Sequence, residues 1–301
     1  MKLSIIVPIY NESKTLQVLY ERMMSVLSKM ASDFEIILVN DGSSDDSFEL
    51  ICQLAQKNDK LKWVNFSRNF GHQAAISAGI AHATGDALVT MDGDLQDPPE
   101  LIPSLVEEWE AGYEVIYARR SRRKGDFWGK KIAAFLFYRI LKIITPVPIP
   151  EDVGDFRLID KKVSHELLSM PEPQRFLRGQ IAWMGFSSSF VEFEREERFA
   201  GESKYTLRKL IQLALNGIWG FSKFPITMLW VFTLSLFIMT IGLFIYGCLK
   251  EFDSQISMIL PLLFFVLTCN SGVMALLGEY LYRVFDASRN RPAYIIKDTN
   301  L

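Results

Sequence analysis

Cysteine, histidine and net charge are all scarce in this chain. The three cysteines among its 301 residues share no metal-ligand spacing, and two lie in apolar runs, so we expect neither a disulfide framework nor a zinc site. His72, His82 and His165 are too scattered to suggest a nucleophile–base pair. The position of His72 allows it to line a site, but a solvent-exposed residue is the favoured interpretation. The net charge is -2 with no long block of one sign, so no field recruits nucleic acid.

Charge is missing altogether from two long runs, residues 225–249 and 254–278. Each exceeds the ~20 apolar residues that cross a ~30 Å hydrocarbon core. Only Lys250–Asp253 separates them, so we predict a transmembrane hairpin over residues 225–282. Basic residues flank it on both sides, which by the positive-inside rule places a tail of residues 283–301 and the N-terminal part of the chain in the cytoplasm. The apolar N-terminal run Leu3–Ile9 lacks a cleavage site and is interpreted as a strand rather than a secretion signal.

Two further segments, about 130–145 and 205–224, combine an apolar helical stripe with Lys and Arg. Such helices lie on anionic membrane surfaces. Either segment alone fits an ordinary core helix equally well, and the neighbouring hairpin favours the membrane.

Residues 1–119 alternate between β-rich runs and helical patterns. Strands are predicted at Leu3–Ile9, Phe34–Asn40, Lys62–Phe66, Ala87–Met91 and Glu114–Ala118, with helices at Lys14–Met30, Asp46–Lys57, His72–Ala83 and Pro98–Ala111. This alternation predicts an α/β domain with a mainly parallel sheet. In such sheets the ligand site lies outside the carboxyl ends of the strands.

An acidic motif, Asp92-Gly93-Asp94, follows the fourth predicted strand, and Gln96 comes two residues later. Paired carboxylates at a strand end suit Mg²⁺ or Mn²⁺ that also binds a diphosphate. Alone, Asp-x-Asp is a common acidic turn. Asp41, which follows the second strand, adds a second acidic strand end.

Together with these motifs, Ile6-Val7-Pro8-Ile9-Tyr10-Asn11-Glu12, Arg68-Asn69-Phe70-Gly71, Gly154-Asp155-Phe156-Arg157 and Gly201-Glu202-Ser203-Lys204-Tyr205 occur in order. The set resembles the glycosyltransferases of family 2 with the GT-A (Rossmann-like) fold. Within that family it resembles the polyprenyl-phosphate glycosyltransferases: dolichol-phosphate mannose synthase and, more closely, the bactoprenol glucosyltransferases of O-antigen modification. The resemblance covers essentially the whole chain and implies a GT-A domain over residues 1–204.

The resemblance implies roles for particular residues. Catalysis is assigned to Asp92, Asp94 and Asp155, and the metal ligands would be Asp92, Asp94 and Gln96. The donor nucleotide would contact Pro8, Tyr10, Asn11, Glu12, Asp41, Arg68, Asn69, Gly71, Asp92, Gly93 and Lys204. Arg119 and Lys130 would hold the acceptor phosphate, within a basic stretch that includes Arg120, Arg122, Arg123, Lys124 and Lys131. A salt bridge from Asp155 to Arg157 is the structural alternative for that carboxylate.

The implied reaction is inverting transfer of a hexose, glucose from UDP-glucose, to undecaprenyl phosphate at the inner membrane. Mannose synthases typically carry Ser-Gly-Phe-Arg where this chain has Gly-Asp-Phe-Arg, which favours the glucosyl branch. N-acetylglucosamine, mannose and 4-amino-arabinose donors stay open. A processive polysaccharide synthase is disfavoured because the Gln-x-x-Arg-Trp motif is missing, and a non-catalytic scaffold or translocator because the acidic pair is intact. The short hairpin offers little helix packing within one chain, which favours a homo-oligomer.

Overall fold

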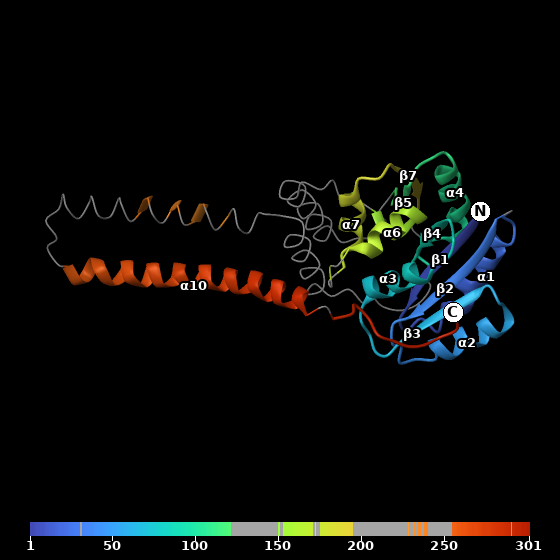
Figure 1. The fold of residues 1–301 in the computed structure, drawn as a ribbon, viewed down its shortest axis with the longest axis horizontal. Helices are drawn as coiled ribbons and strands as arrows, with labels where there is room; N and C mark the ends of the chain where they lie inside the picture. Colours follow the sequence, from blue (N-terminus) through green and yellow to red (C-terminus); the bar gives the residue numbers. More distant parts are fainter. Residues whose placement is uncertain are drawn as a thin grey trace.

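The computed structural model describes residues 1–30, 32–121, 153–170, 175–194, 255–289 and 291–301, with a few single positions between them. The described part consists of an α/β domain and one long helix that extends away from it (Figure 1). Both ends of the chain lie in the α/β domain (Figure 1). The predicted segments 130–145 and 205–224 lie outside the described residues, as do Lys130 and Lys204.

The described strands form one sheet in the order β7-β5-β6-β4-β1-β2-β3-β8. Their bounds are β1 Lys2–Ile9, β2 Asp33–Asn40, β3 Leu61–Phe66, β4 Ala87–Thr90, β5 Val115–Arg120, β6 Val153–Asp160, β7 Ser188–Phe193 and β8 Ile296–Thr299. The central strands β4, β1, β2 and β3 run parallel, whereas β6 is antiparallel to both β4 and β5, and β8 is antiparallel to β3. The four parallel strands are mostly apolar, as expected for strands whose two faces are both covered by helices.

Helices cover the two faces of the sheet. One face packs against α1 (Leu16–Leu27), α2 (Ser47–Lys57) and α4 (Ile102–Glu110), which follows the short 3₁₀ turn η1 (Pro99–Leu101). The other face packs against α3 (His72–His82), α6 (Lys161–Ser169) and α7 (Leu177–Met184). Alternate residues of the strands point to opposite faces, so β1 sends Ile5 into the first core and Ile6 into the second.

The predicted elements of residues 1–119 are confirmed, with ends that differ by a few residues. Three strands were not predicted: β6, β7 and β8. The insertion of β6 between β4 and β5 means that the fifth predicted strand does not neighbour the fourth. β8 lies within residues 283–301, for which the sequence predicted only a tail, and it joins the sheet of the α/β domain beside β3.

Helix α10 (Gln255–Ser288) is 34 residues long and includes the second predicted span. Large apolar side chains along it are exposed, among them Leu263, Leu267, Met274 and Leu277. Counting only the residues that the structure describes, no helix combines the length and the apolar character that crossing a membrane requires. Apart from single positions between 228 and 239, the first predicted span lies outside the described residues. The hairpin therefore stays a prediction.

Candidate active site

The candidate site lies at the edge of the sheet where β1, β2 and β4 end. Because these three strands are parallel, the loops that follow them meet at one edge, as the sequence predicted. β6 runs the opposite way, with Arg157 opposite Thr90, so the start of β6 reaches the same edge. Asp155 is thereby brought beside the loop that follows β4.

The loop after β4 holds the predicted metal ligands in a constrained turn. Leu95 has a φ of 62°, a left-handed conformation that residues other than glycine rarely adopt. The backbone N–H of Gln96 donates to Asp94 Oδ1 at 3.2 Å, and the N–H of Asp92 donates to Asp97 Oδ2 at 3.2 Å. Asp97 is fully buried, and burial beside Asp92 raises its pKa to about 7. The left-handed backbone of Leu95 is strained, and such strain persists where surrounding contacts hold a loop in one conformation.

His72 lies between two of the three predicted catalytic carboxylates, Asp92 and Asp155. Its Nε2 lies 3.3 Å from Asp92 Oδ1 and 3.2 Å from Asp155 Oδ2. Burial alone would lower the pKa of this imidazole, but the charges of Asp92 and Asp155 outweigh it and raise the pKa to about 9. The favoured interpretation of His72 as a solvent-exposed residue was therefore wrong, and the alternative that it lines the site is the one the structure supports. The signal that could have identified it is its place directly after Gly71, at the start of a helix that begins at the site edge.

Asp155 is held by four side chains. Arg157 pairs with its Oδ1, Arg178 Nη2 lies 3.8 Å from the same oxygen, and Gln73 Nε2 donates to Oδ2 at 3.1 Å. Burial would raise the pKa of this carboxyl, but the hydrogen bond from His72 and the two guanidinium charges hold it well below its usual range. The Asp155–Arg157 salt bridge that the sequence offered as an alternative is thus present, within a network that also reaches Asp92.

The predicted donor-nucleotide residues Asn11 and Asp41 hold two neighbouring loops together. The N–H of Asn11 donates to Ser43 Oγ at 3.0 Å, and Asn11 Oδ1 accepts from the N–H of Ser44 at 2.8 Å. Asn11 itself has a φ of 53°. These bonds fix the turn after β1 against the turn after β2.

The Asp41 carboxylate accepts hydrogen bonds from the loop after β3. Its donors are Phe70 N at 2.7 Å, Gly71 N at 3.0 Å and Asn69 Nδ2 at 3.0 Å. Burial raises the pKa of Asp41 despite these bonds. The carboxylate therefore positions the Arg68–Gly71 loop, and its predicted contact with the base or ribose stays a prediction.

The remaining predicted donor residues that the structure describes lie around the same edge. Pro8 is buried at the end of β1, Glu12 donates its N–H to Ser47 Oγ at 2.9 Å, and Tyr10 is exposed. The carbonyl of Gly93 accepts from Thr15 Oγ1 at 3.1 Å. This bond ties the loop Asp92–Asp97, called the acidic loop below, to the start of α1.

Two arginines end β5 and differ in surroundings. Arg119 stacks its guanidinium on the ring of Phe190, with Cζ 3.6 Å from the ring centroid. Burial raises the pKa of both Asp92 and Asp97, and the charge of Arg120 counteracts part of that rise. Among the described residues, Arg120 Nε is a buried donor with no hydrogen-bond partner. Arg120 is thus an arginine whose charge acts on the acidic loop, and the role of Arg119 at the acceptor phosphate stays a prediction.

The residues present fit a divalent cation in donor type. Asp92 and Asp94 offer carboxylate oxygens, and Gln96 an amide oxygen. Within the described part of the chain, Asp92 Oδ1 is a buried acceptor that receives no hydrogen bond, although His72 Nε2 makes an ion-pair contact with it at 3.3 Å. No group of three or more His, Cys, Asp or Glu residues among the described ones is arranged to hold a metal by itself. A site completed by substrate phosphate oxygens is the usual arrangement for Mg²⁺.

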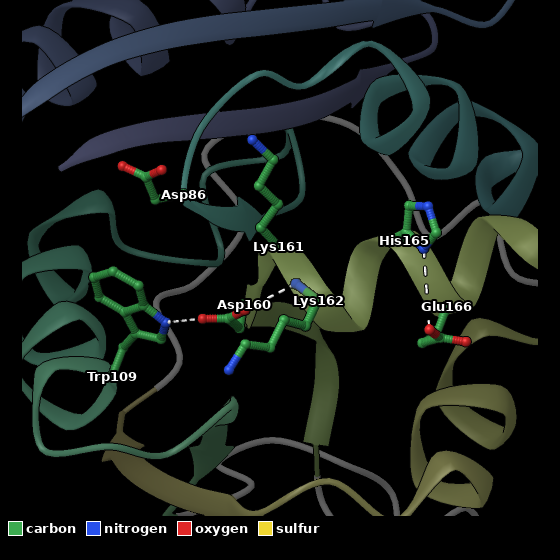
Figure 2. A pocket seen from close by; sticks show the side chains of 7 residues that line it. All are labelled: Asp86, Trp109, Asp160, Lys161, Lys162, His165 and Glu166. Atoms are coloured by element: carbon green, nitrogen blue, oxygen red, sulfur yellow. Dashed lines mark hydrogen bonds and ion pairs between the residues drawn. The ribbon is translucent and has the colours of Figure 1, made fainter.

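A separate shallow depression lies at the opposite edge of the sheet, where β4 begins and β6 ends (Figure 2). It is lined by Asp86, Trp109, Asp160, Lys161, Lys162, His165 and Glu166. Trp109 Nε1 donates to Asp160 Oδ2 at 2.8 Å, and Asp160 also caps α6 by accepting from the N–H of Lys162. These bonds give Trp109 and Asp160 structural roles in the fold.

Comparison with known proteins relates this geometry to a family. Residues 4–168 match the model of glycosyl transferase family 2. An uncharacterized glycosyltransferase of Bacillus subtilis, YkcC, is 41% identical over 98% of this chain and 93% of its own length. The bactoprenol glucosyl transferase of Shigella phage SfV is 38% identical over 99% of each chain.

Solved structures agree on the fold. Glucosyl-3-phosphoglycerate synthase from Mycobacterium tuberculosis, solved with Mn²⁺, UDP-glucose and phosphoglyceric acid, has a TM-score of 0.52 at 17% identity, covering 72% of this chain and 77% of that one. The same enzyme with Mg²⁺ and UDP also gives 0.52, at 18% identity over 72% and 76%. With the α/β sheet and the acidic loop, the family match shows that this chain belongs to glycosyltransferase family 2.

Proposed function

We propose that this enzyme transfers glucose from UDP-glucose to undecaprenyl phosphate with inversion at the anomeric carbon. The observation that carries the proposal is the acidic loop Asp92–Asp97 after β4, which His72 links to Asp155 through contacts of 3.3 Å to Asp92 and 3.2 Å to Asp155. A full-length relative named bactoprenol glucosyl transferase supports the substrate pair. In the reaction, an oxygen of the lipid phosphate forms a bond to the anomeric carbon while the bond to the UDP oxygen breaks.

The donor half of the site consists of the loops after β1, β2 and β3 together with the acidic loop. Asp92, Asp94 and Gln96 would hold Mg²⁺ or Mn²⁺, which when bound neutralises the charge that develops on the leaving diphosphate. The loops braced by Asn11 and Asp41 would surround the base and ribose. Lys204, from the Gly-Glu-Ser-Lys-Tyr motif, is proposed to reach the diphosphate.

The acceptor half needs cations more than it needs a base. A polyprenyl phosphate is already an anionic nucleophile at neutral pH, so orientation is the main requirement. Asp155, with its lowered pKa, stays ionised and is a weak proton acceptor, which suits a role in holding a sugar hydroxyl. Arg119 and Lys130 are the proposed acceptor-phosphate residues, and the unpartnered Nε of Arg120 adds a third candidate.

We further propose that the enzyme is anchored in the cell inner membrane by the hairpin of residues 225–282, with its catalytic domain in the cytoplasm. The charge-free runs 225–249 and 254–278 and the exposed apolar side chains of α10 support this. β8 pairs with β3, so the chain on both sides of the hairpin belongs to one sheet. The chain must therefore cross the membrane an even number of times between β7 and β8.

A donor panel tests the reaction. The full chain in detergent is incubated with undecaprenyl phosphate, Mg²⁺ and UDP-glucose, UDP-N-acetylglucosamine, GDP-mannose or UDP-4-amino-arabinose, and the lipid product is identified by mass spectrometry. The expected product is a glucosyl lipid phosphate of β configuration. A different sugar on the lipid would replace glucose in the proposal, and no product with any donor would favour a non-catalytic scaffold.

A further inference from the structure

The C-terminal strap, defined here as residues 291–299, packs against the outer side of the loop Arg68–Gly71. It follows α10 and includes β8, which pairs Thr299 with Val64 and Ile296 with Phe66. Beyond the strand, the N–H of Ser67 donates to the carbonyl of Ile295 at 3.0 Å. The strap thus stays hydrogen-bonded to the chain up to the residue before Arg68.

An aromatic chain continues from the strap into the loop. Tyr294 stacks on Phe66, with ring centroids 5.0 Å apart and an interplanar angle of 14°. Phe66 in turn meets Phe70 edge to face at 5.7 Å, and the Arg68 guanidinium lies 4.0 Å from the centroid of Phe70. Aromatic pairs of this geometry add specific attraction to the area that they bury.

The loop is therefore held from two sides. On the inner side the Asp41 carboxylate accepts from the N–H groups of Phe70 and Gly71. On the outer side, Tyr294 and Ile296 pack with Phe70 against the core under α3. Residues 67–70 follow the end of β3 and form no regular element of their own, so contacts from both sides determine where Arg68 and Gly71 lie.

We propose that the strap is a positioning element of the donor site, in which Tyr294 acts through Phe66 and Phe70 to place the Arg68–Gly71 loop. The inference rests on the proposed role of that loop in binding the donor nucleotide. Because the strap is continuous with α10, it also ties the helix to the nucleotide edge of the sheet. Tyr294 is a positioning residue and touches no reacting atom.

The test compares Tyr294→Ala with Tyr294→Phe in the full chain. Loss of the ring should raise the KM for UDP-glucose about three- to tenfold and leave kcat nearly unchanged, because the loop binds the donor and takes no part in bond making. Tyr294→Phe keeps the ring and should restore the KM. Tyr113→Ala removes an exposed tyrosine at the opposite edge of the sheet and serves as the matched control. An unchanged KM in Tyr294→Ala, or an equal loss of kcat that Tyr294→Phe does not restore, would overturn the proposal.

Hydrogen exchange provides a readout independent of activity. The amide hydrogens of Phe70 and Gly71, which are bonded to Asp41, should exchange faster in Tyr294→Ala and at the original rate in Tyr294→Phe. Unchanged exchange at both amides would contradict the strap's role.

Arg68→Ala separates this inference from the proposed function. If Arg68→Ala leaves the KM for UDP-glucose unchanged, the donor role of the loop is wrong and the strap proposal falls with it. If Arg68→Ala raises the KM while Tyr294→Ala does not, only the strap proposal fails.

Discussion

At the scale of single residues, the candidate site is organised by carboxylates and the cationic side chains that pair with them. Three buried or half-buried carboxylates lie close together there, those of Asp92, Asp97 and Asp155. Each of them would destabilise the fold if its charge were left unpaired. His72 bridges two of these carboxylates, and Arg157 and Arg178 add charge beside Asp155. The positions of these cations determine which carboxylates stay ionised.

His72→Ala should reduce transfer at least about tenfold, which corresponds to roughly 1.4 kcal/mol of transition-state stabilisation. The physical reason is that Asp92 and Asp155 lose their shared cation and repel each other. His72→Gln can still donate one hydrogen bond and should retain more activity than His72→Ala. Steady-state kinetics on both variants, with thermal melting to confirm folding, is the measurement. Equal activity of His72→Ala and the unaltered enzyme would contradict the bridging role.

Asp94→Ala should lower kcat by at least about a hundredfold, because charge on the leaving diphosphate would lose its compensation. The side chain is only partly buried, so the melting temperature should change little. Asp59→Ala removes an exposed carboxylate elsewhere and is the control. Full activity in Asp94→Ala would refute the metal assignment.

At the scale of elements, the loops that end the parallel strands are placed by close backbone approaches and by short polar networks. Gly42 illustrates the first. Its φ is 65°, and a Cβ there would lie 2.4 Å from the backbone carbonyl carbon of Arg68. Only glycine allows the turn after β2 to meet the loop after β3 at this distance.

Gly42→Ala should therefore displace the Arg68–Gly71 loop and raise the KM for UDP-glucose. Gly185→Ala is a matched control, because Gly185 has a similar φ of 72° and no atom within 4 Å of its added Cβ. The control should show only the strain of a left-handed residue, about 1–2 kcal/mol of stability, and an unchanged KM. Kinetics and thermal melting of the two variants distinguish the effects. Similar KM values in both would show that the close approach is unimportant for the donor.

Glu35 illustrates the polar networks that link β2 to its neighbours. It is 6% exposed and accepts from Ser4 Oγ at 2.6 Å, Thr84 N at 2.7 Å and Lys2 Nζ at 3.1 Å. Burial alone would raise its pKa, but these bonds together lower it. A lowered pKa stabilises the fold above the unfolded value near 4.5, and the stabilisation is lost as the pH falls through the folded value.

Glu35→Gln should accordingly reduce the free energy of unfolding at pH 7 by about 1–3 kcal/mol, since the Ser4 and Thr84 donors lose a charged acceptor. The difference from the unaltered protein should shrink as the pH falls below about 4.5, where Glu35 itself becomes protonated. Urea unfolding followed by tryptophan fluorescence over this pH range is the measurement. A difference that is constant with pH would show that the charge of Glu35 is not the stabilising feature.

At the scale of the whole molecule, one sheet collects both ends of the chain. β1 lies at its centre and β8 at its edge, with α10 extending away from the domain between them in sequence (Figure 1). The stretch of chain between β7 and β8 therefore begins and ends at the same sheet.

A cysteine introduced as Lys297→Cys in a cysteine-free background should react with an impermeant maleimide in inside-out vesicles and stay unlabelled in intact cells. Glu251→Cys, between the two charge-free runs, should show the opposite pattern, because a hairpin places its turn across the membrane from its ends. Labelling of position 297 in intact cells would rule out the proposed topology.

The sequence by itself determined the order of elements in residues 1–119 and the edge at which the acidic motif lies. Both follow from local patterns, since alternating β-rich and helical segments force parallel strands whose carboxyl ends share one edge. The tertiary structure alone decided that His72 meets Asp155, 83 positions away, and that the segment around Asn300 returns to Trp63, 237 positions away. Neither contact has a local signature in the sequence. Asp155 reaches His72 because β6 inserts between β4 and β5, and Asn300 reaches Trp63 because β8 adds to the sheet beside β3.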